Sequence, residues 1–581
     1  PLAAQSADGS ADEGVFPEPD HLLTVRFDPA TVIGLDLDRM ETYETDYAPD
    51  GQLDRMLVRQ RAADPNRTLI GVERTDLFWG LPVYFGLASV TDPSTGETTS
   101  GLAGGLGRTS DGVTRVFLRV APFDGSPGDY IQLDFLPEPP TPSPPPVNPF
   151  LADSAAPIGH INSAQTDSSR APGPLGPTET LTADDITYEY VGPAHFGLAI
   201  SPEYPNGERT IWTNGGDRIS KVRYDTLETI SELPIKLTLM TEQTSEDRIA
   251  LLDSLSGADL ALAAFPLAAE ELFGLAGVYY ALDSDNTLFV GGANSIIAYA
   301  DSDPSDPNSP IVLKDEWVKP AEIGGSFVGA NMTFDGKLAL VTDEGWVVVA
   351  ERDFSNYWAA EMVGNEIAPQ WNADKIAEGF RPGAASWVRN SAAVDADGGI
   401  YVPSLEHMHK IVWDGTSLST DPADGAWVAP YQNGRGIGTG ATPSLMGFDG
   451  ENEFVVITDG DNLMNVVLFW RNDIPADWQQ IPGTLDRRIA GQQPADFDDP
   501  ALTDVQTEQA VVVGGFGAAV VNNEPASIPP GFPAAAKLIL VGYAGSDPAF
   551  TPLGIQKFEW DPVSQSFDDA SVPFPVTSSR R

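Results

Sequence analysis

The sequence predicts an all-β fold, a six- or seven-bladed β-propeller with a β-rich appendage at its N-terminal end. The first observation is a pattern that recurs from about residue 195 onward: an apolar run, a turn rich in Asp, Asn or Gly, a second apolar run and another polar turn. The second is the spacing of the copies, roughly 50 to 85 residues, which suits the sheet-sized blade of a propeller. The third is composition, because 581 residues of which 41% are hydrophobic can fill a large core.

The N-terminal region, residues 1–136, is predicted to be rich in strands. Its apolar and β-branched runs lie between turns of Gly, Asp and Ser, as the strands of a sheet do. The clearest runs are Leu22–Phe27, Leu77–Phe85 and Thr114–Val120. Two interpretations stay open for this region, a separate domain and one additional blade.

Residues 137–181 are predicted to be a Pro-rich linker. From Pro137 to Pro149 the chain is dominated by proline, which favours a stiff, extended backbone, and a stretch rich in Ser, Gly and Pro follows. This change of composition is the clearest domain boundary in the sequence. The same segment could instead run across the surface of a neighbouring domain.

Residues 182–581 contain the repeats and are predicted to form the propeller. In each repeat the first apolar run is taken as the innermost strand of a blade and the second run as its neighbour. The predicted innermost strands are 195–201, 279–283, 331–334, 390–395, 444–448 and 508–514. The predicted second strands are 210–214, 287–291, 338–343, 400–404, 454–459 and 538–542. Third strands end in an aromatic residue and Asp, most clearly in Lys410–Asp414 and Lys557–Asp561.

Two segments interrupt the repeats. Residues 244–273 are predicted to be a helical insertion, since Glu246–Asp253 has helix-forming residues at helical spacing. We expect this insertion to cap one face of the propeller. The gap between Val520 and Lys537 is predicted to be a second insertion, in the form of a loop.

The charge of the chain excludes some partners. Lys and Arg number 33 and Asp and Glu 84, so the net charge is −51, which repels nucleic acid and anionic membranes. Solubility in a salty environment and recruitment of a cationic substrate would both explain it.

No apolar run is long enough for a membrane span, so no membrane insertion is expected. The chain has no Cys, and its first residues look like a processed start; both suit a secreted or periplasmic protein of a marine or halophilic bacterium.

Polar residues at the start of the innermost strands define the predicted functional site. In a propeller these positions converge on the central tunnel although they are distant in sequence. They are His195, Tyr279 or Tyr280, Asn331, Asn390, Ser444 and Glu508. Carboxylate and amide oxygens that converge in this way suit Ca²⁺, with Glu508 as the anionic ligand. Alternatively, these side chains only bond water and cap strand ends.

One blade resembles a known family. The segment from Arg389 to Val402 is similar to the blade sequence of gluconolactonase and strictosidine-synthase-like propellers, although the Gly that follows Asn in that family is Ser391 here. The resemblance implies that Asn331 and Asn390 are amide ligands of a catalytic metal, with Glu508 as the carboxylate ligand. It further implies that Asp459 acts as acid or base. Quinoprotein-like propellers share the same blade pattern, but their repeated tryptophan docking motif is absent from this sequence.

Other residues offer further chemistry. His195 is predicted at the tunnel mouth, where a histidine could be a general base or could simply bond a backbone carbonyl. His407 and His409 would point the same way on a strand and could hold one metal, although a solvated turn at the periphery fits them better. The run Gly434–Gly440 resembles a phosphate-binding loop but is better explained as a turn between blades.

Together these observations predict an exported propeller that acts on a small molecule at its central tunnel, as a Ca²⁺-dependent, lactonase- or esterase-like hydrolase. Glu508, Asn331 and Asn390 would hold the metal, and Asp459 or His195 would move protons. A non-catalytic recognition or structural propeller that binds a cell-surface component is the first alternative. A quinoprotein-type oxidoreductase is the second.

Overall fold

The computed structural model describes the chain as two compact units, residues 1–141 and 142–581. Described residues in the first unit are those of nine strands between residues 21 and 137. In the second they are 143–169, 186–193, 197–272, 279–363 and 387–570, with short gaps at 449, 451, 526, 531, 533–536 and 546. Among these residues, no helix has the length and apolar character that a membrane crossing needs.

The first unit is a nine-stranded sheet of its own. Its strand order is β1-β9-β8-β7-β6-β5-β4-β3-β2, with β1 and β9 parallel and every other pair antiparallel. The predicted run Leu77–Phe85 spans the end of β5 and the start of β6, which pair antiparallel. The strands are β1 His21–Phe27, β2 Ile33–Asp36, β3 Glu41–Tyr47, β4 Leu53–Gln60, β5 Leu69–Phe78, β6 Leu81–Thr91, β7 Thr98–Ser110, β8 Val113–Pro122 and β9 Tyr130–Pro137.

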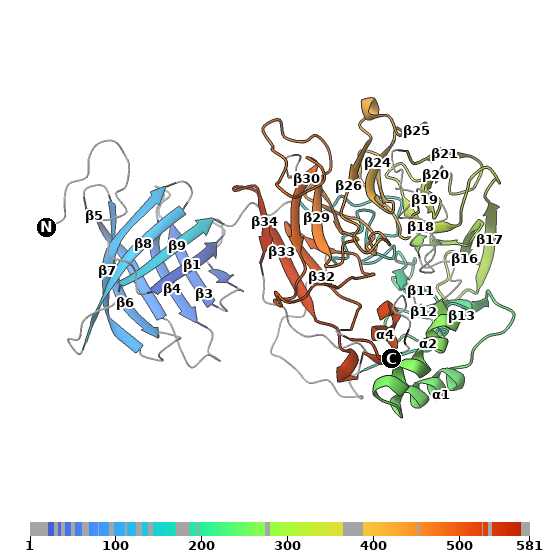
Figure 1. The fold of residues 1–581 in the computed structure, drawn as a ribbon, viewed down its shortest axis with the longest axis horizontal. Coiled ribbons are helices and arrows are strands. Elements are labelled where there is room, and N and C mark those ends of the chain that lie inside the picture. The colour runs from blue at the N-terminus through green and yellow to red at the C-terminus, as the bar shows by residue number, and fades with distance from the viewer. Residues whose placement is uncertain are drawn as a thin grey trace. The chain divides into compact units, whose positions relative to one another are not determined.

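The second unit is built from antiparallel sheets, six of which lie in its described part (Figure 1). Each sheet consists of consecutive strands, so we number the sheets one to six along the chain. The first three are β10 Leu198–Ile200, β11 Thr210–Asn214, β12 Arg218–Arg223 and β13 Thr229–Pro234; β14 Tyr280–Leu282, β15 Thr287–Gly291, β16 Ser295–Asp301 and β17 Ile311–Val318; and β18 Phe327–Met332, β19 Leu338–Thr342, β20 Trp346–Ala350 and β21 Tyr357–Glu361.

The last three sheets follow the same order, except that the fourth has a fifth strand, β26, paired with β24. They are β22 Ala393–Val394, β23 Gly399–Pro403, β24 His407–Trp413, β25 Leu418–Ser419 and β26 Trp427–Pro430; β27 Ser444–Met446, β28 Phe454–Thr458, β29 Asn465–Trp470 and β30 Ile489–Pro494; and β31 Val512–Gly514, β32 Gly517–Val521, β33 Ile555–Asp561 and β34 Ser566–Asp569. Strands β11 and β15 have the predicted bounds. The all-β prediction is therefore confirmed, and the repeats are antiparallel sheets, most of them with four strands.

One predicted strand is wrong. Residues 538–542 belong to helix α4 (Lys537–Ala544), and the second strand of the sixth sheet is β32 instead. The run Leu538–Gly542 is short and wholly apolar, and such a run has no periodicity that separates a strand from a buried helix. The insertion in the sixth sheet is therefore longer than predicted and partly helical.

The recurrent Asp in the sequence pattern closes the turn between the first two strands of a sheet. One oxygen of Asp283 accepts hydrogen bonds from the backbone of Asp285 and Thr287, at 3.0 and 2.7 Å. Asp395 accepts the same two bonds from Asp397 and Gly399, at 3.0 and 2.7 Å. These carboxylates thus replace missing backbone partners in the turn, which is why the motif returns along the chain.

The first strands of the six sheets surround a segment of the chain itself, which we call the axial segment (residues 148–168). It exchanges hydrogen bonds with strands β10, β14, β22, β27 and β31 through their backbones and with β18 through the Asn331 side chain. Figure 1 shows it as the teal coil between the sheets. A single segment can bond every first strand only if those strands face a common axis. The sheets are therefore blades around this segment, and their first strands are the innermost ones.

The axial segment changes the expected picture of the tunnel. Its residues Ser163, Ala164, Gln165 and Thr166 are all buried, with exposed fractions of 1 to 5%. The described middle part of the predicted linker, residues 148–168, is consequently part of the core of this unit. A ligand can meet the axis only at its ends, because protein fills its middle.

The predicted helical insertion is two helices, α1 (Glu242–Asp253) and α2 (Gly257–Leu272). They pack against α4 from the sixth sheet in a separate small core that includes Leu260, Ala264 and Leu540. The backbone nitrogen of Gly257 also donates to the Asp547 carboxylate at 2.8 Å. The insertion that follows the first sheet and the insertion within the sixth sheet therefore pack together, and they join these two sheets.

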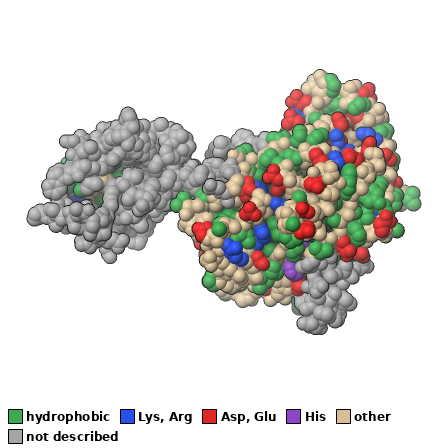
Figure 2. All heavy atoms as spheres, turned by 90° about the horizontal axis from the view of Figure 1, so that it is seen from above, with side chains coloured by type: hydrophobic (Ala, Val, Ile, Leu, Met, Phe, Trp, Pro, Cys, Tyr) green, Lys and Arg blue, Asp and Glu red, His purple; other side chains and the backbone are tan. Residues whose placement is uncertain are grey.

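The acidic residues do not gather in one patch on the face shown in Figure 2. Asp and Glu side chains are spread over the described surface, with fewer Lys and Arg between them. Dispersed negative charge favours solubility, and counterions screen its self-repulsion in salt.

Candidate functional site

The end of the axis at which the innermost strands begin carries three of the predicted site residues. Tyr279 directly precedes β14, Asn390 lies three residues before β22, and Glu508 lies four residues before β31. We call this end the mouth. The group of seven residues that lies there is the mouth cluster: His160, Asp167, Tyr279, Arg389, Asn390, Thr442 and Glu508.

Tyr279 connects three sheets at the mouth. Its hydroxyl donates to the Asn390 side-chain oxygen at 3.2 Å and lies 3.0 Å from the Thr442 hydroxyl. Burial raises the pKa of Tyr279, and the nearby carboxylates of Glu508 and Asp167 raise it further. This phenol therefore keeps its proton at neutral pH and serves as a hydrogen-bond donor. The structure thus brings together two of the residues that the sequence placed in one ring.

The axial segment contributes an imidazole–carboxylate pair. The Nδ1 atom of His160 lies 2.9 Å from both carboxylate oxygens of Asp167, and the ring lies 5.7 Å from that of Tyr279, centroid to centroid. The His160 and Asp167 side chains are 18% and 23% exposed. No described residue bonds the second ring nitrogen, Nε2. A carboxylate on Nδ1 fixes the tautomer that leaves Nε2 as the proton acceptor.

The loop from His160 to Asp167 is held tightly. Ile161, Gln165 and Asp167 have left-handed backbone angles, with φ of 73°, 55° and 54°. A β-branched residue such as Ile161 adopts this conformation rarely, since it strains the backbone. Backbone hydrogen bonds from Asn162 and Asp167 to the His160 carbonyl, at 2.9 and 3.4 Å, close the loop. The strain is thus retained in the loop that places the imidazole beside its carboxylate.

Arg389 and Glu508 form an ion pair beside Asn390. The Nη2 atom of Arg389 lies 2.5 Å from each carboxylate oxygen of Glu508. Its Nη1 donates to the Ile437 carbonyl at 3.2 Å, and its guanidinium lies 5.7 Å from the Trp387 ring centre. The two partners are 20% and 31% exposed. Both oxygens of the expected metal ligand thus contact a cation of the protein.

The glycine-rich run Gly434–Gly440 forms part of the mouth. It lies between β26 and β27, and its Ile437 and Thr439 carbonyls accept hydrogen bonds from Arg389 and Asn390. A Cβ at Gly440 would lie 2.0 Å from the Thr507 carbonyl oxygen, so only glycine permits this close approach. The run is a turn between blades, as expected, and it also positions two mouth residues.

Asn331 lies deeper in the axis than the sequence predicted. Strand β18 begins at Phe327, four residues before Asn331, whose side chain is fully buried. Its amide nitrogen donates to the carbonyls of Ser163 and Ala392, at 2.9 and 2.8 Å, and its oxygen accepts from the Met332 nitrogen at 2.7 Å. Every polar atom of this side chain is therefore engaged, and it binds the axial segment to the third and fourth sheets.

Asp459 closes a turn between β28 and β29. One oxygen accepts from the backbone nitrogens of Asn465 and Asp461 at 2.8 and 3.2 Å, and the other accepts from the Asn465 side chain at 2.7 Å. The residue is fully buried, and burial raises its pKa to about 7. Its carboxyl group therefore shares no hydrogen bond with the mouth cluster.

Three histidines were also among the predicted residues. His195 lies outside the described residues. His407 and His409 lie on strand β24 rather than in a solvated turn. His409 is buried, its Nε2 lies 2.9 Å from the Ser404 hydroxyl, and burial lowers its pKa to about 3. A neutral, hydrogen-bonded core histidine explains it, and the interpretation as a solvated turn is wrong.

The residues predicted to bind Ca²⁺ do not form a ligand set. Both oxygens of Glu508 face Arg389, and the Asn331 oxygen accepts from the Met332 nitrogen inside the axis. A cation at Glu508 would also lie next to the positive guanidinium. No group of three or more His, Asp or Glu residues suited to a metal occurs among the described residues.

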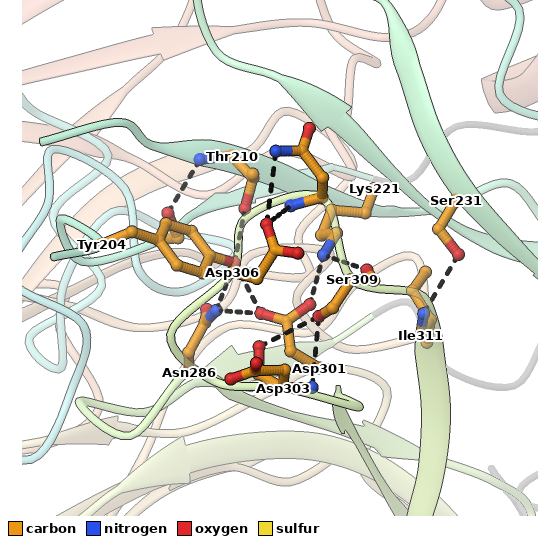
Figure 3. A network of polar contacts seen from close by, with 12 residues as sticks. Tyr204, Thr210, Lys221, Ser231, Asn286, Asp301, Asp303, Asp306, Ser309 and Ile311 are labelled. Carbon is orange, nitrogen blue, oxygen red and sulfur yellow. Dashed lines mark hydrogen bonds and ion pairs between the residues drawn. The ribbon is translucent and has the colours of Figure 1, made fainter. Parts of the chain in front are cut away.

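A second polar region lies between the first two sheets (Figure 3). Lys221 is fully buried and donates to Asp301 and to the Ser309 carbonyl. The other oxygen of Asp301 accepts from Tyr204 at 2.6 Å and Asn286 at 2.7 Å. Tyr204, Asn286 and Asp301 of this network also line a groove of about 590 Å³. Its donors are already bound to Asp301, so the network joins the two sheets and offers little to a ligand.

Sequence reasoning missed His160, Asp167 and Arg389. His160 and Asp167 lie in the segment predicted to be a linker, because Pro, Ser and Gly dominate its composition. One available signal was the presence of apolar residues in that segment, such as Leu151 and Ile158, both buried in the structure. A second was that one of only five histidines in the chain lies there.

Comparison with known proteins gives one clear relative. A protein of Archaeoglobus fulgidus, described as uncharacterized, is 32% identical over 449 residues, covering 73% of each chain. The chain belongs to the family of this archaeal protein. No protein-family model matches the sequence. Since this relative is described as uncharacterized, membership in its family assigns no activity to the chain.

Solved structures similar to this family member are propellers and related proteins. Virginiamycin B lyase from Staphylococcus aureus is 13% identical, with a TM-score of 0.26, and the match covers 72% of this chain and 92% of that one. The Cps50 (Swd1) β-propeller domain of Myceliophteria thermophila is 10% identical, with a TM-score of 0.29 over 54% and 76% of the two chains. A Bacteroides caccae protein of unknown function is 11% identical, with a TM-score of 0.27 over 62% and 92%. Similarities this distant say nothing about the activity of the family.

Proposed function

We propose that the second unit is a six-bladed propeller that hydrolyses a small ester or lactone at its mouth without a metal, with His160 as the general base. The observation that supports this most is the contact of His160 Nδ1 with both oxygens of Asp167, at 2.9 Å. The pair lies at the surface end of a filled axis, among residues from several blades. Such a position is accessible to a small molecule and has rigid surroundings.

The chemistry follows from the orientation of the imidazole. Asp167 holds the proton of His160 on Nδ1, so Nε2 can accept a proton from a water molecule. The resulting hydroxide equivalent attacks the carbonyl carbon of the substrate, and the imidazolium then returns the proton to the leaving oxygen. Asp167 stabilises the transient positive charge on the ring. General base catalysis of this kind contributes a factor of about 10² to 10⁴ to the rate.

Tyr279 would complete the site as a positioning and donor residue. Its ring packs beside His160, and its protonated hydroxyl lies among Asn390 and Thr442. A neutral phenol can donate a hydrogen bond to a substrate oxygen on which negative charge develops. Electrostatic stabilisation of this kind usually contributes most to catalysis. In the free protein this hydroxyl donates to Asn390, so it would turn from Asn390 to the substrate oxygen during the reaction.

The Ca²⁺-dependent variant of this activity needs a rearrangement. Glu508 would have to leave Arg389, and the buried Asn331 side chain would have to turn its oxygen from the Met332 nitrogen to the mouth, which would also break its bonds to Ser163 and Ala392. Losing the two buried bonds of Asn331 costs about 1–3 kcal/mol for each group left unpaired. The metal-free site therefore fits the described arrangement better.

A non-catalytic recognition propeller is the second candidate. The observation that favours it is the saturation of the axis, where Asn331 and the axial segment satisfy each other by hydrogen bonds. A ligand of the mouth or of the loops would then bind without being changed. We expect export to a saline environment for either candidate, since the net charge of −51 suits it.

Kinetics of the purified full chain on a panel of aryl esters and lactones test the proposal. His160→Gln and Asp167→Asn should each lower kcat/KM at least about 100-fold, since the base or its orientation is lost. Asp153→Asn is the matched control, because it makes the same change at an exposed position of the axial segment. We expect it to retain the activity of the unaltered protein.

Two results would contradict the proposal. Undiminished turnover by His160→Gln would exclude this histidine as the base. Binding of panel compounds without turnover would favour the recognition propeller. Diethyl pyrocarbonate offers an independent check, since the reagent should modify the accessible His160 and spare His409, which is buried.

A further inference from the structure

We infer that the substrate of the mouth site carries a carboxylate, which Arg389 binds after Glu508 has turned away. This inference rests on the proposed function and names the class of its substrate. In the free protein Glu508 would occupy the place of the substrate group. The residue would therefore act as an internal competitor rather than as a metal ligand.

Arg389 is held in place independently of Glu508. Its Nη1 donates to the Ile437 carbonyl, and its guanidinium lies over the Trp387 ring. Only Nη2 contacts the carboxylate. A planar guanidinium anchored on one side is prepared to receive a carboxylate on the other. Loss of Glu508 would thus leave a formed anion site and not a displaced side chain.

Glu508 is anchored by its backbone but not by its side chain. Its backbone nitrogen donates to Asn523 at 2.8 Å, as the hydroxyl of Thr507 does at 2.7 Å. Arg389 is the only described residue that hydrogen-bonds its carboxylate, which is 31% exposed. The pair is only part-buried, so water can replace Arg389 as the partner of the carboxylate when the Glu508 side chain changes rotamer.

The location of the pair connects it to the proposed reaction. Arg389 precedes Asn390, whose side-chain oxygen accepts the Tyr279 hydroxyl, and Tyr279 packs against His160. The Glu508 carboxylate is close enough to Tyr279 to raise the pKa of that phenol. The charge beside Arg389 therefore affects the other end of the mouth cluster electrostatically. A substrate carboxylate on Arg389 would restore the same charge, and the scissile carbonyl could then lie towards His160.

Acetate is the probe for a titration by isothermal calorimetry at constant ionic strength. Glu508→Gln, which keeps the shape and removes the competing charge, should bind acetate at least about tenfold more tightly than the unaltered chain. Arg389→Met should abolish binding, and Arg389→Lys should retain only part of it. Glu203→Gln is the matched control, because it breaks an exposed pair with Arg209 elsewhere on the same unit.

Equal acetate affinity in Glu508→Gln and the unaltered chain would overturn the inference, and so would undiminished binding by Arg389→Met. Tighter binding of phosphate than of acetate by Glu508→Gln would reject the carboxylate class. Circular dichroism and the melting temperature verify the fold of each variant, and Glu508→Gln keeps the test valid should Arg389→Met fail to fold. Acetate binding is measured without turnover. A failed esterase assay therefore counts against the proposed function, whereas absent acetate binding counts only against this inference.

Discussion

Asn331 donates a 2.9 Å hydrogen bond to the carbonyl of Ser163, a residue that precedes it by 168 positions. This contact joins the innermost strand of the third sheet to the axial segment. The same amide nitrogen reaches Ala392 in front of the fourth sheet. A residue that the sequence suggested as a metal ligand is thus a structural link, with its hydrogen-bonding capacity used inside the protein.

Asn331→Ala should destabilise the second unit. The change leaves two buried carbonyls and the Met332 nitrogen without partners, which should lower the free energy of unfolding by about 2–3 kcal/mol. Urea unfolding followed by tryptophan fluorescence measures the effect. Asn294→Ala is the control, because Asn294 is exposed, and it should unfold like the unaltered chain. A loss below 0.5 kcal/mol, roughly the scale of surface substitutions, would refute this role of Asn331.

Lys221→Met should be more harmful than removal of the whole ion pair. The single variant leaves the Asp301 carboxylate buried without its cation, and breaking such a pair costs about 3–5 kcal/mol. Lys221→Met combined with Asp301→Leu removes both charges and should recover part of that loss. Tyr204 and Asn286 can then still bond each other, at 2.6 Å. A double variant that is less stable than Lys221→Met would argue against this explanation.

Asp459 should make stability depend on pH. Its pKa is about 7 in the folded protein against an ordinary value of 3.8, so between these values the folded state holds a proton that the unfolded chain releases. Stability from this group is therefore lost as pH rises from about 4 to about 7, by at most about 4 kcal/mol. Asp459→Asn should gain stability relative to the unaltered chain over this range. A difference between the two proteins that is independent of pH would contradict the expectation.

Calcium should not stabilise the protein specifically. Since Glu508 contacts Arg389 and Asn331 is fully bonded, millimolar CaCl2 and NaCl of equal ionic strength should give the same melting temperature. A rise with calcium that Glu508→Gln abolishes would restore the metal site that the sequence suggested. Elemental analysis of protein purified without chelator provides the second measurement.

Much of the blade architecture could be predicted from the sequence because its signal is local. Apolar runs separated by Asp turns recur between strands of several sheets, as at Asp283 and Asp395. The start of β18 was misplaced, since Asn331 stands inside an apolar run whose beginning carries no turn residue. Helix α4 was misread as a strand because a short apolar run carries no period.

The candidate site was predicted only in part, because two of its seven residues come from a segment without a repeat. Tyr279, Asn390 and Glu508 begin blades and could be aligned. His160 and Asp167 lie in a stretch whose composition is that of a linker, and its role depends on contacts with strands that come later in the chain. No local pattern shows which strands a proline-rich segment will contact.

The position of the axial segment also restricts how this protein can fold. Residues 148–168 leave the ribosome before any of the six sheets, and each sheet consists of consecutive strands. A completed ring could admit the segment only by threading it lengthwise through the centre. The nascent chain can instead add each sheet to a peptide that is already present, in the order of synthesis, with the bond from Val513 to Thr166 among the last to form. The protein thus carries its own assembly template, which remains between the six sheets.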